Sequence, residues 1–222
     1  MNTTDHSDAE PYDARSRLVM SALRLFAEKG YKAASTREIC DAAGANISAI
    51  RYYFGDKAGL YRAAFTEPMG DSPCGTDIAA YRHLALPEIL NRFFSEFLEP
   101  LKKGEEFRLV MKLHYREMIE PTGAWQQEID AEIKPQHAML VTLLKEHMGL
   151  QRIDTDLHRL AFSLIGMAVY FYVGQDVVST ISPQLLSSAK HIDALAERLA
   201  SYALAMIESE TARRQQGISY EK

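Results

Sequence analysis

Histidine and cysteine are the side chains in this sequence that could bind a metal or act as a nucleophile, and their spacing favours neither role. The chain has seven histidines, and none lies three residues after a carboxylate, so it has no Glu-x-x-His or His-Glu-x-x-His pair. Neither Cys40 nor Cys74 has a local sequence typical of a nucleophile, although a redox role for Cys74 stays open. The sequence also lacks a glycine-rich phosphate loop and a Gly-x-Ser-x-Gly motif. We therefore expect no enzyme activity, no metal site and no cofactor.

Basic side chains, which could contact phosphate, are concentrated in one stretch of an otherwise acidic chain. The formal net charge is −5. Residues 15–66 hold nine bases and four acids, whereas residues 1–14 hold four acids and no base and residues 67–222 hold 16 bases and 22 acids. A compact basic block on an acidic body is expected when a single module contacts nucleic acid.

The apolar spacing is helical along the whole chain, without hairpin turns or sustained alternation, and predicts an all-α fold. We expect about nine helices, near 15–29, 35–44, 46–53, 56–65, 87–103, 106–120, 124–148, 155–177 and 189–212. Pro135 should kink or break the third of the longer helices. The segment 67–76 holds two prolines and two glycines, which is typical of a loop between domains.

The helices near 35–44 and 46–53 form the part of the chain that could bind DNA. Ser35 and Glu38 are spaced as a capping box, Asn46 is a favourable N-cap, and Gly44 supplies a tight turn between the helices. Helices joined by so short a turn cross steeply, which is the geometry of a helix-turn-helix, and the helix near 15–29 would close its core. Periodicity alone leaves open a three-helix packing unit with no role in DNA binding.

The residue identities favour the DNA-binding interpretation. The segment TREICDAAGANISAIRYYFGDKAGLY (residues 36–61), preceded by ALRLFAEKGY (residues 22–31), resembles the DNA-binding domain of the TetR family of bacterial transcription regulators. The resemblance implies a helix-turn-helix domain at 15–66, behind a flexible acidic segment at 1–14. It also implies a helical ligand-binding and dimerisation domain at 77–212.

The resemblance also implies roles for individual residues. Thr36, Tyr52, Tyr53 and Lys57 match positions that usually hold the phosphate backbone, and Ser48 and Arg51 match positions that reach base edges. The expected DNA-contact set is Thr36, Arg37, Asn46, Ile47, Ser48, Arg51, Tyr52, Tyr53 and Lys57. The family often has Tyr or Asn at the position of Arg51 and Lys at that of Ile47, so the operator sequence is not implied. For Arg51 the alternative is a solvated surface charge.

Two helices near the C-terminus carry apolar stripes that could form a dimer interface. The helix at 189–212 presents Ile192, Leu195, Leu199, Tyr202 and Met206, with small Ala196 and Ala203 beside them. Pairing of this helix and the one at 155–177 with their copies would form a four-helix interface, as in TetR relatives, and the dimer would read an inverted repeat in double-stranded operator DNA. The alternative is that the stripes face the chain's own core.

An effector site is expected in the C-terminal domain. The segment Tyr115-Arg116-Glu117-Met118 followed by Glu120-Pro121-Thr122 resembles regulators with a CecR-type C-terminal domain. The expected ligand set, for a mainly apolar small molecule, is Phe107, Met111, His114, Glu117, Met118, Trp125 and Tyr170. The alternative is that these side chains fill the core.

We thus expect a DNA-binding regulator, a repressor that a small molecule releases from its operator. The alternative is a helical ligand-binding or interaction protein without sequence-specific DNA binding. The apolar run at 160–173 is too short to span a membrane. Because residues 1–13 lack an apolar stretch and the chain has two cysteines, we expect a cytoplasmic protein without a signal peptide.

Overall fold

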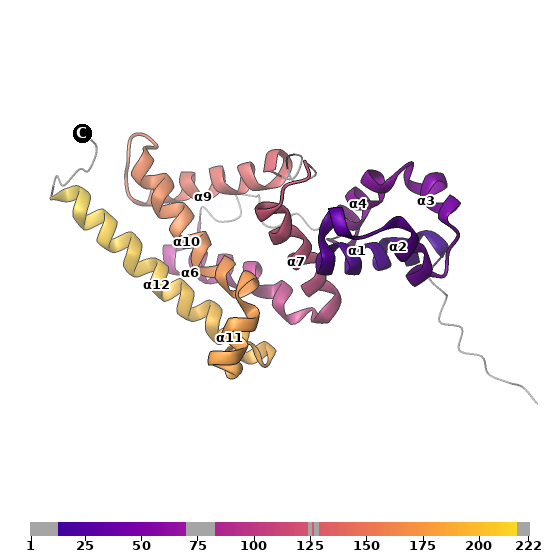
Figure 1. Cartoon of the computed structure of the whole chain (residues 1–222). Helices are drawn as coiled ribbons and strands as arrows, with labels where there is room; N and C mark the ends of the chain where they lie inside the picture. The colour runs from indigo at the N-terminus through magenta and orange to yellow at the C-terminus, as the bar shows by residue number, and fades with distance from the viewer. Residues whose placement is uncertain (1–12, 70–82, 124–125, 127–128, 217–222) are drawn as a thin grey trace, which may run out of the picture. The chain divides into compact units, whose positions relative to one another are not determined.

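The computed structural model describes residues 13–69, 83–123, 126 and 129–216, and these form helices joined by loops. The described residues contain no strand, so the predicted all-α class is confirmed. The chain divides into two compact units (Figure 1). The first unit comprises Met1–Gly70 with Leu113–Ala124, and the second comprises Asp71–Lys112 with Trp125–Lys222. The division into domains at 15–66 and 77–212 remains our proposal, and the residue pattern gave no sign that 113–124 would pack with the N-terminal helices.

The first unit is built from short capped helices. They are α1 (Ala14–Ala33), α2 (Thr36–Ala43), α3 (Ile47–Phe54) and α4 (Lys57–Thr66), followed by the 3₁₀ turn η1 (Glu67–Met69), and the second half of α7 (Gly104–Ile119) joins them. The predicted N-cap hydrogen bonds are confirmed: Ser35 accepts from the Glu38 amide at 3.1 Å, and Asn46 accepts from the Ser48 amide at 3.0 Å. The capping box at Ser35 is only half formed, because the Glu38 carboxylate pairs with Lys29. Gly44 ends α2 in the left-handed region, with φ 60°.

The first helix does not stop at Lys29, as we expected, but continues to Ala33 across a kink at Gly30. Gly30 has φ +82°, which other residues rarely adopt. A Cβ atom there would also lie 2.7 Å from Nε of Arg116. Only glycine therefore lets the backbone turn at this point and lets the Arg116 guanidinium approach it.

The second unit contains longer helices. They are α6 (Leu86–Leu98), the 3₁₀ turn η2 (Glu99–Lys102), the first half of α7, the π-helical turn η3 (Ile129–Ile133), α9 (Lys134–His147), α10 (Thr155–Val173), α11 (Gln175–Ile181), the 3₁₀ turn η4 (Pro183–Leu186) and α12 (Ala189–Gln215). Pro135 lies in the first turn of α9, where its missing N–H costs nothing, so it starts a helix instead of kinking one.

The helix expected at 155–177 is broken at Gly174, which gives ten α-helices in the described residues instead of about nine. A Cβ atom at Gly174 would lie 3.0 Å from the carbonyl oxygen of Tyr170, so the close backbone approach at this bend favours glycine. The axes of α10 and α11 differ by 76°. No single helix among the described residues is long and apolar enough to cross a membrane; only the bent α10–α11 pair reaches the required length and composition.

The core of the second unit includes the apolar face of α12. This helix runs along α6 and also packs on α10 (Figure 1). Its buried residues include Ile192, Leu195, Ala196, Leu199 and Ala203, which are at most 7% exposed. These residues face the chain's own core, so the part of the predicted dimer stripe that they form was wrong. Tyr202, on the flank of the same helix, is 52% exposed.

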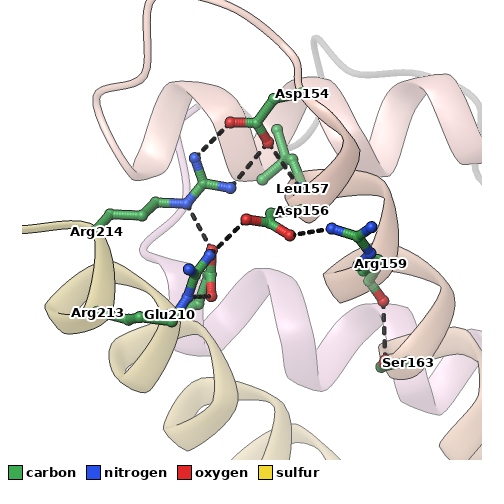
Figure 2. A network of polar contacts seen from close by, with 8 residues as sticks. All are labelled: Asp154, Asp156, Leu157, Arg159, Ser163, Glu210, Arg213 and Arg214. Carbon is green, nitrogen blue, oxygen red and sulfur yellow. Dashed lines mark hydrogen bonds and ion pairs between the residues drawn. The ribbon is translucent and has the colours of Figure 1, made fainter. Parts of the chain in front are cut away.

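An ion-pair network joins the end of α12 to the start of α10 (Figure 2). Arg214 donates to both carboxylate oxygens of Asp154, at 2.7 and 2.9 Å, and Arg213 donates to Asp156 at 2.7 Å. Glu210 accepts from both arginines. The hydrogen bonds from Arg214 lower the pKa of Asp154 to about 2. Because these side chains are mostly shielded from solvent, the pairs hold the two helix ends together more firmly than exposed pairs would.

We expect Arg214→Met to lower the free energy of unfolding by about 1–2 kcal/mol near neutral pH. The pKa of Asp154 is about 2 in the folded chain, against 3.8 for the unpaired carboxyl group. The stabilisation should therefore be complete above pH 3.8 and be lost as the pH falls through 2. Urea unfolding over this range should show the variant converging on the parent protein in acid. Arg198→Met, at an exposed position of α12, is the control, and a difference that does not change with pH would refute the ionic origin.

Candidate nucleic-acid interface

The helix α3 has one side committed to the core and one side open. Ile50 is 4% exposed and packs inward, whereas Ile47 is 56% and Tyr52 82% exposed. Ser48 and Arg51 also lie on the exposed side. Large apolar and aromatic side chains displayed next to an arginine on a short helix are typical of a surface that contacts a partner.

The start of α3 is fixed by Asn46. Its Oδ1 accepts hydrogen bonds from both the backbone amide and the Oγ of Ser48, each at 3.0 Å. Asn46 therefore acts here as a helix cap that orients Ser48. The Ser48 hydroxyl donates its hydrogen bond to Asn46. Its oxygen can still accept a hydrogen bond from a binding partner.

The start of α2 presents backbone donors next to an arginine. Ser35 caps the amide of Glu38, so the amides of Thr36 and Arg37 at the first turn have no intrahelical partner. Thr36 is half-buried and Arg37 is exposed. The positive end of a helix dipole next to a guanidinium group favours an anion such as a phosphate.

Lys57, at the start of α4, is held over an aromatic ring. Its Nζ lies 4.6 Å from the centre of the Tyr31 ring. Burial lowers the pKa of Lys57, and the ring fixes the position of the ammonium group. Nearby, Tyr53 and Tyr52 meet edge to face with ring centres 4.8 Å apart.

Five of the nine expected DNA-contact residues lie around one shallow hollow of about 660 Å³. They are Asn46, Ser48, Arg51, Tyr52 and Tyr53. Thr36, Arg37, Ile47 and Lys57 lie outside its lining. The hollow also includes Ala14, the first residue of α1, which sequence reasoning missed because an alanine carries no signal for binding.

Part of the basic block at 15–66 serves the fold. Arg15 donates to both oxygens of Glu67, at 2.8 and 2.7 Å, and Arg17 donates to the carbonyl of Ala43 at 3.1 Å. Lys29 pairs with Glu38. These three charges are engaged inside the unit. Arg37 and Arg51, in contrast, are exposed members of the block.

A buried carboxylate braces the helices that carry this surface. Glu117 of α7 has no exposed surface and accepts from the hydroxyl of Tyr61, on α4, at 2.6 Å. It also accepts from the amide and hydroxyl of Thr122, at 2.6 and 2.9 Å, and from the amide of Gly123 at 3.1 Å. Burial, together with the hydrogen bond to Glu117, raises the pKa of Tyr61. The carboxylate therefore ties α4 to the end of α7.

Two further contacts of α7 belong to the same brace. The ring of His114 stacks on Phe65 of α4, with centres 3.9 Å apart. Arg116 donates to the carbonyls of Glu28 and Lys29, just before the kink of α1 at Gly30, at 3.4 Å each. The Arg116 guanidinium group also pairs with Glu120 at 3.3 Å, and the kink of α1 at Gly30 leaves the two carbonyls open to it.

The expected ligand set does not gather in one cavity. His114 and Glu117 are buried in the first unit, as described, while Met118 and Tyr170 are 54% and 53% exposed. Phe107 is half-buried beneath Lys103, and Trp125 lies outside the described residues. Of the described members of the set, Met111 alone lines a cavity of about 410 Å³ in the second unit. Helical periodicity identified the inward face of α7. It did not show that His114 and Glu117 on this face contact α4 while Met111 lines the cavity.

The described residues contain no group of three or more histidine, cysteine or acidic side chains that could hold a metal ion. Cys40 is buried, and burial raises the pKa of its thiol. Cys74 lies outside the described part of the chain.

Comparison with known proteins covers both parts of the chain. Residues 18–64 match the family described as bacterial regulatory proteins, tetR family, and residues 86–208 match the C-terminal domain of the HTH-type transcriptional dual regulator CecR. The CecR protein of Shigella flexneri is 31% identical over 176 residues, which are 74% of this chain and 78% of the relative. The HTH-type transcriptional repressor AcnR of Corynebacterium glutamicum is 38% identical over 58 residues, 26% of this chain and 31% of the relative.

Solved structures share the fold at lower identity. A putative transcriptional regulator from Pseudomonas aeruginosa PAO1 superimposes with a TM-score of 0.65 at 20% identity, over 94% of this chain and 96% of that one. The fatty acid degradation regulator FadR from Bacillus halodurans gives a TM-score of 0.60 at 18% identity, over 88% and 96%.

The brace at Glu117 yields a stability prediction. Tyr61→Phe should lower the free energy of unfolding by about 1–3 kcal/mol, because it leaves a buried carboxylate without one of its donors. Glu117→Gln and the double variant complete a thermodynamic cycle, and the two sites should couple by at least about 0.5 kcal/mol. Tyr52→Phe, at an exposed position of the same unit, is the control when unfolding is measured without DNA. Additive effects of the two substitutions in urea unfolding would show that the hydrogen bond contributes nothing.

Proposed function

The chain belongs to the TetR family of DNA-binding transcription regulators and carries the C-terminal domain of CecR-type regulators, and we propose that it is a homodimeric repressor that a small molecule releases from its operator. The observation that carries the DNA-binding part of the proposal is the open side of α3, where Ser48, Arg51 and Tyr52 line the same hollow. Repression agrees with the role of AcnR, a transcriptional repressor, while CecR is a transcriptional dual regulator.

In this proposal Ser48 and Arg51 read bases in the major groove, and Ile47 contacts thymine methyl groups. Phosphates are held by Thr36, Arg37, Tyr52, Tyr53 and Lys57, while Asn46 keeps α3 in position. Since α3 is short and its inner side is buried, only its N-terminal turn and one flank can enter the groove. Two copies in a symmetric dimer would read an inverted repeat, with half-sites about one helical turn or somewhat more apart.

The proposed dimer surface is the outer face of α10 and α12. On α10, Phe162, Tyr170 and Val173 are 63%, 53% and 55% exposed, with the exposed Gly166 between them. Tyr202 of α12, at 52% exposure, adds to this surface. Exposed apolar side chains on two neighbouring helices support burial against a second copy.

A small molecule acts in this proposal by preferring the state that does not bind DNA. A hundredfold preference corresponds to about 2.7 kcal/mol, which is enough for a usable switch. The alternative, a helical interaction protein without sequence-specific DNA binding, predicts that the exposed residues of α3 have no effect on any DNA complex.

The two classes of DNA contact predict different behaviour of variants. Arg51→Ala should weaken operator binding by about 1–3 kcal/mol and relax the preference at one base pair in each half-site. Lys57→Met, which keeps an apolar stem over the Tyr31 ring, should weaken binding to all sequences alike and reduce the salt slope by about one per subunit. Gel shifts with DNA flanking the protein's own gene and with random DNA, at several salt concentrations, measure both effects.

Arg24→Ala, at an exposed arginine of α1 outside the hollow, is the control for charge alone. Equal loss of affinity for every sequence in Arg51→Ala would move Arg51 to the phosphate contacts. A parent protein that shifts no DNA fragment in preference to random DNA would contradict the proposed repressor function and support the alternative.

Gly166 offers a test of the dimer surface. A Cβ atom at Gly166 has no heavy atom within 4 Å, and glycine inside a helix costs about 1 kcal/mol relative to alanine. Gly166→Arg should therefore leave the folded chain at least as stable, yet block close packing of a second copy. Sedimentation should show monomers for Gly166→Arg and dimers for Ala138→Arg, which adds the same side chain at an exposed position of α9. A Gly166→Arg variant that remains dimeric would exclude this face.

A further inference from the structure

The second unit contains a cavity of about 410 Å³ whose walls come from α7, α10, α11 and the turns η2 and η4. Leu101, Met111, Leu186 and Tyr172 give it an apolar part. The hydroxyl of Tyr172 already donates to the carbonyl of Phe97, so Tyr172 offers the cavity its ring. The volume is in the range that accommodates a small organic molecule.

Among the described residues, the polar side chains that line the cavity form no hydrogen bonds or ion pairs with one another. Arg108 lines the cavity and makes no hydrogen bond or ion pair with any residue that the structure describes. Gln175 and Ser179, one turn apart on α11, add neutral hydrogen-bonding groups whose side chains are likewise unengaged within the described ranges.

Glu105 lines the same cavity but does not balance Arg108. It is the second residue of α7, where the positive end of the helix dipole stabilises a carboxylate. It forms no ion pair with Arg108, although the two residues lie one turn apart. Arg108 is exposed, so water and not a carboxylate of the described residues satisfies its guanidinium group. A cationic ligand would be repelled by it, and a wholly apolar ligand would remove water from it without replacing its hydrogen bonds.

We propose that this cavity binds a small anionic amphiphile, a carboxylate or sulfonate group on an apolar body, with Arg108 holding the acid group. A planar guanidinium group suits both acids because it can donate two parallel hydrogen bonds. Met111 is adaptable in shape and, with the Tyr172 ring, contacts the apolar body. The claim that such a ligand is the effector rests on the proposed function. The claim that it binds in this cavity is independent of that function. The expected pocket was mainly apolar, and this cavity differs from it by its arginine.

Two fluorescent probes with the same aromatic body test the proposal. 1-Anilinonaphthalene-8-sulfonate carries an acid group, and N-phenyl-1-naphthylamine lacks it. In the full-length protein, Arg108→Gln should weaken binding of the sulfonate by about tenfold or more and change binding of the neutral probe by less than about twofold. Arg152→Gln, at an exposed position of the second unit outside the cavity, should change neither.

Ser179→Phe places a ring in the cavity and should weaken the binding of both probes. Circular dichroism checks that each variant keeps its helices. If both probes bind Ser179→Phe as well as the parent protein, or if Arg108→Gln affects the two probes equally, the proposal is wrong. Gel shifts with and without the sulfonate separate the two claims. Loss of sulfonate binding in Arg108→Gln without any release of DNA from the parent protein would support the cavity and contradict its role as the effector site.

Discussion

A carboxylate with no exposed surface must find its hydrogen-bond donors inside the protein, because an unpaired charge there is strongly destabilising. Glu117 finds them on α4 and in the residues that follow α7. This requirement explains why the second half of α7 packs with the N-terminal helices. The first half of the same helix, with Arg108 and Met111, lines the cavity of the second unit. One helix therefore supplies contacts to both units.

The proposed DNA-contact surface on α3 is joined to this brace through short connections. Only Gly55 and Asp56 separate α3 from α4, and Asp56 caps α4 through the Gly59 amide at 2.7 Å. The inner face of α4, with Leu60, Tyr61 and Phe65, is buried in the first unit. Glu117 thus holds α4, the helix to which α3 is joined by two residues. The position of Arg51 on α3 therefore depends in part on buried contacts between α4 and α7, which lies far along the sequence.

Sequence reasoning succeeded where a feature is local and failed where it depends on contacts between distant residues. Ser35, Asn46 and Asp56 act within three residues of themselves, so their caps could be predicted from the sequence. A Cβ atom at Gly174 would lie 3.0 Å from the carbonyl oxygen of Tyr170, and a glycine in a helical pattern does not reveal this close approach. The apolar stripe of α12 was recognised, but periodicity cannot distinguish the chain's own core from a second copy. The hydrogen bond from Tyr61 to Glu117 joins residues 56 positions apart and left no local signal.

The magnitudes limit how a ligand could act through α7. A hundredfold preference between two states provides about 2.7 kcal/mol. A hydrogen bond to a charged group such as Glu117 contributes about 1.5–3 kcal/mol, so a ligand of this strength could exchange or weaken one such bond. Removing Phe65 and Leu113 from the core would cost about 1.5–3 kcal/mol for each side chain, in addition to the buried charge. Undocking the whole of α7 from α4 therefore exceeds the free energy available. A proposed switch of this size would therefore keep the apolar contacts of α7 and change the hydrogen bonds at Glu117, which this free energy is large enough to alter.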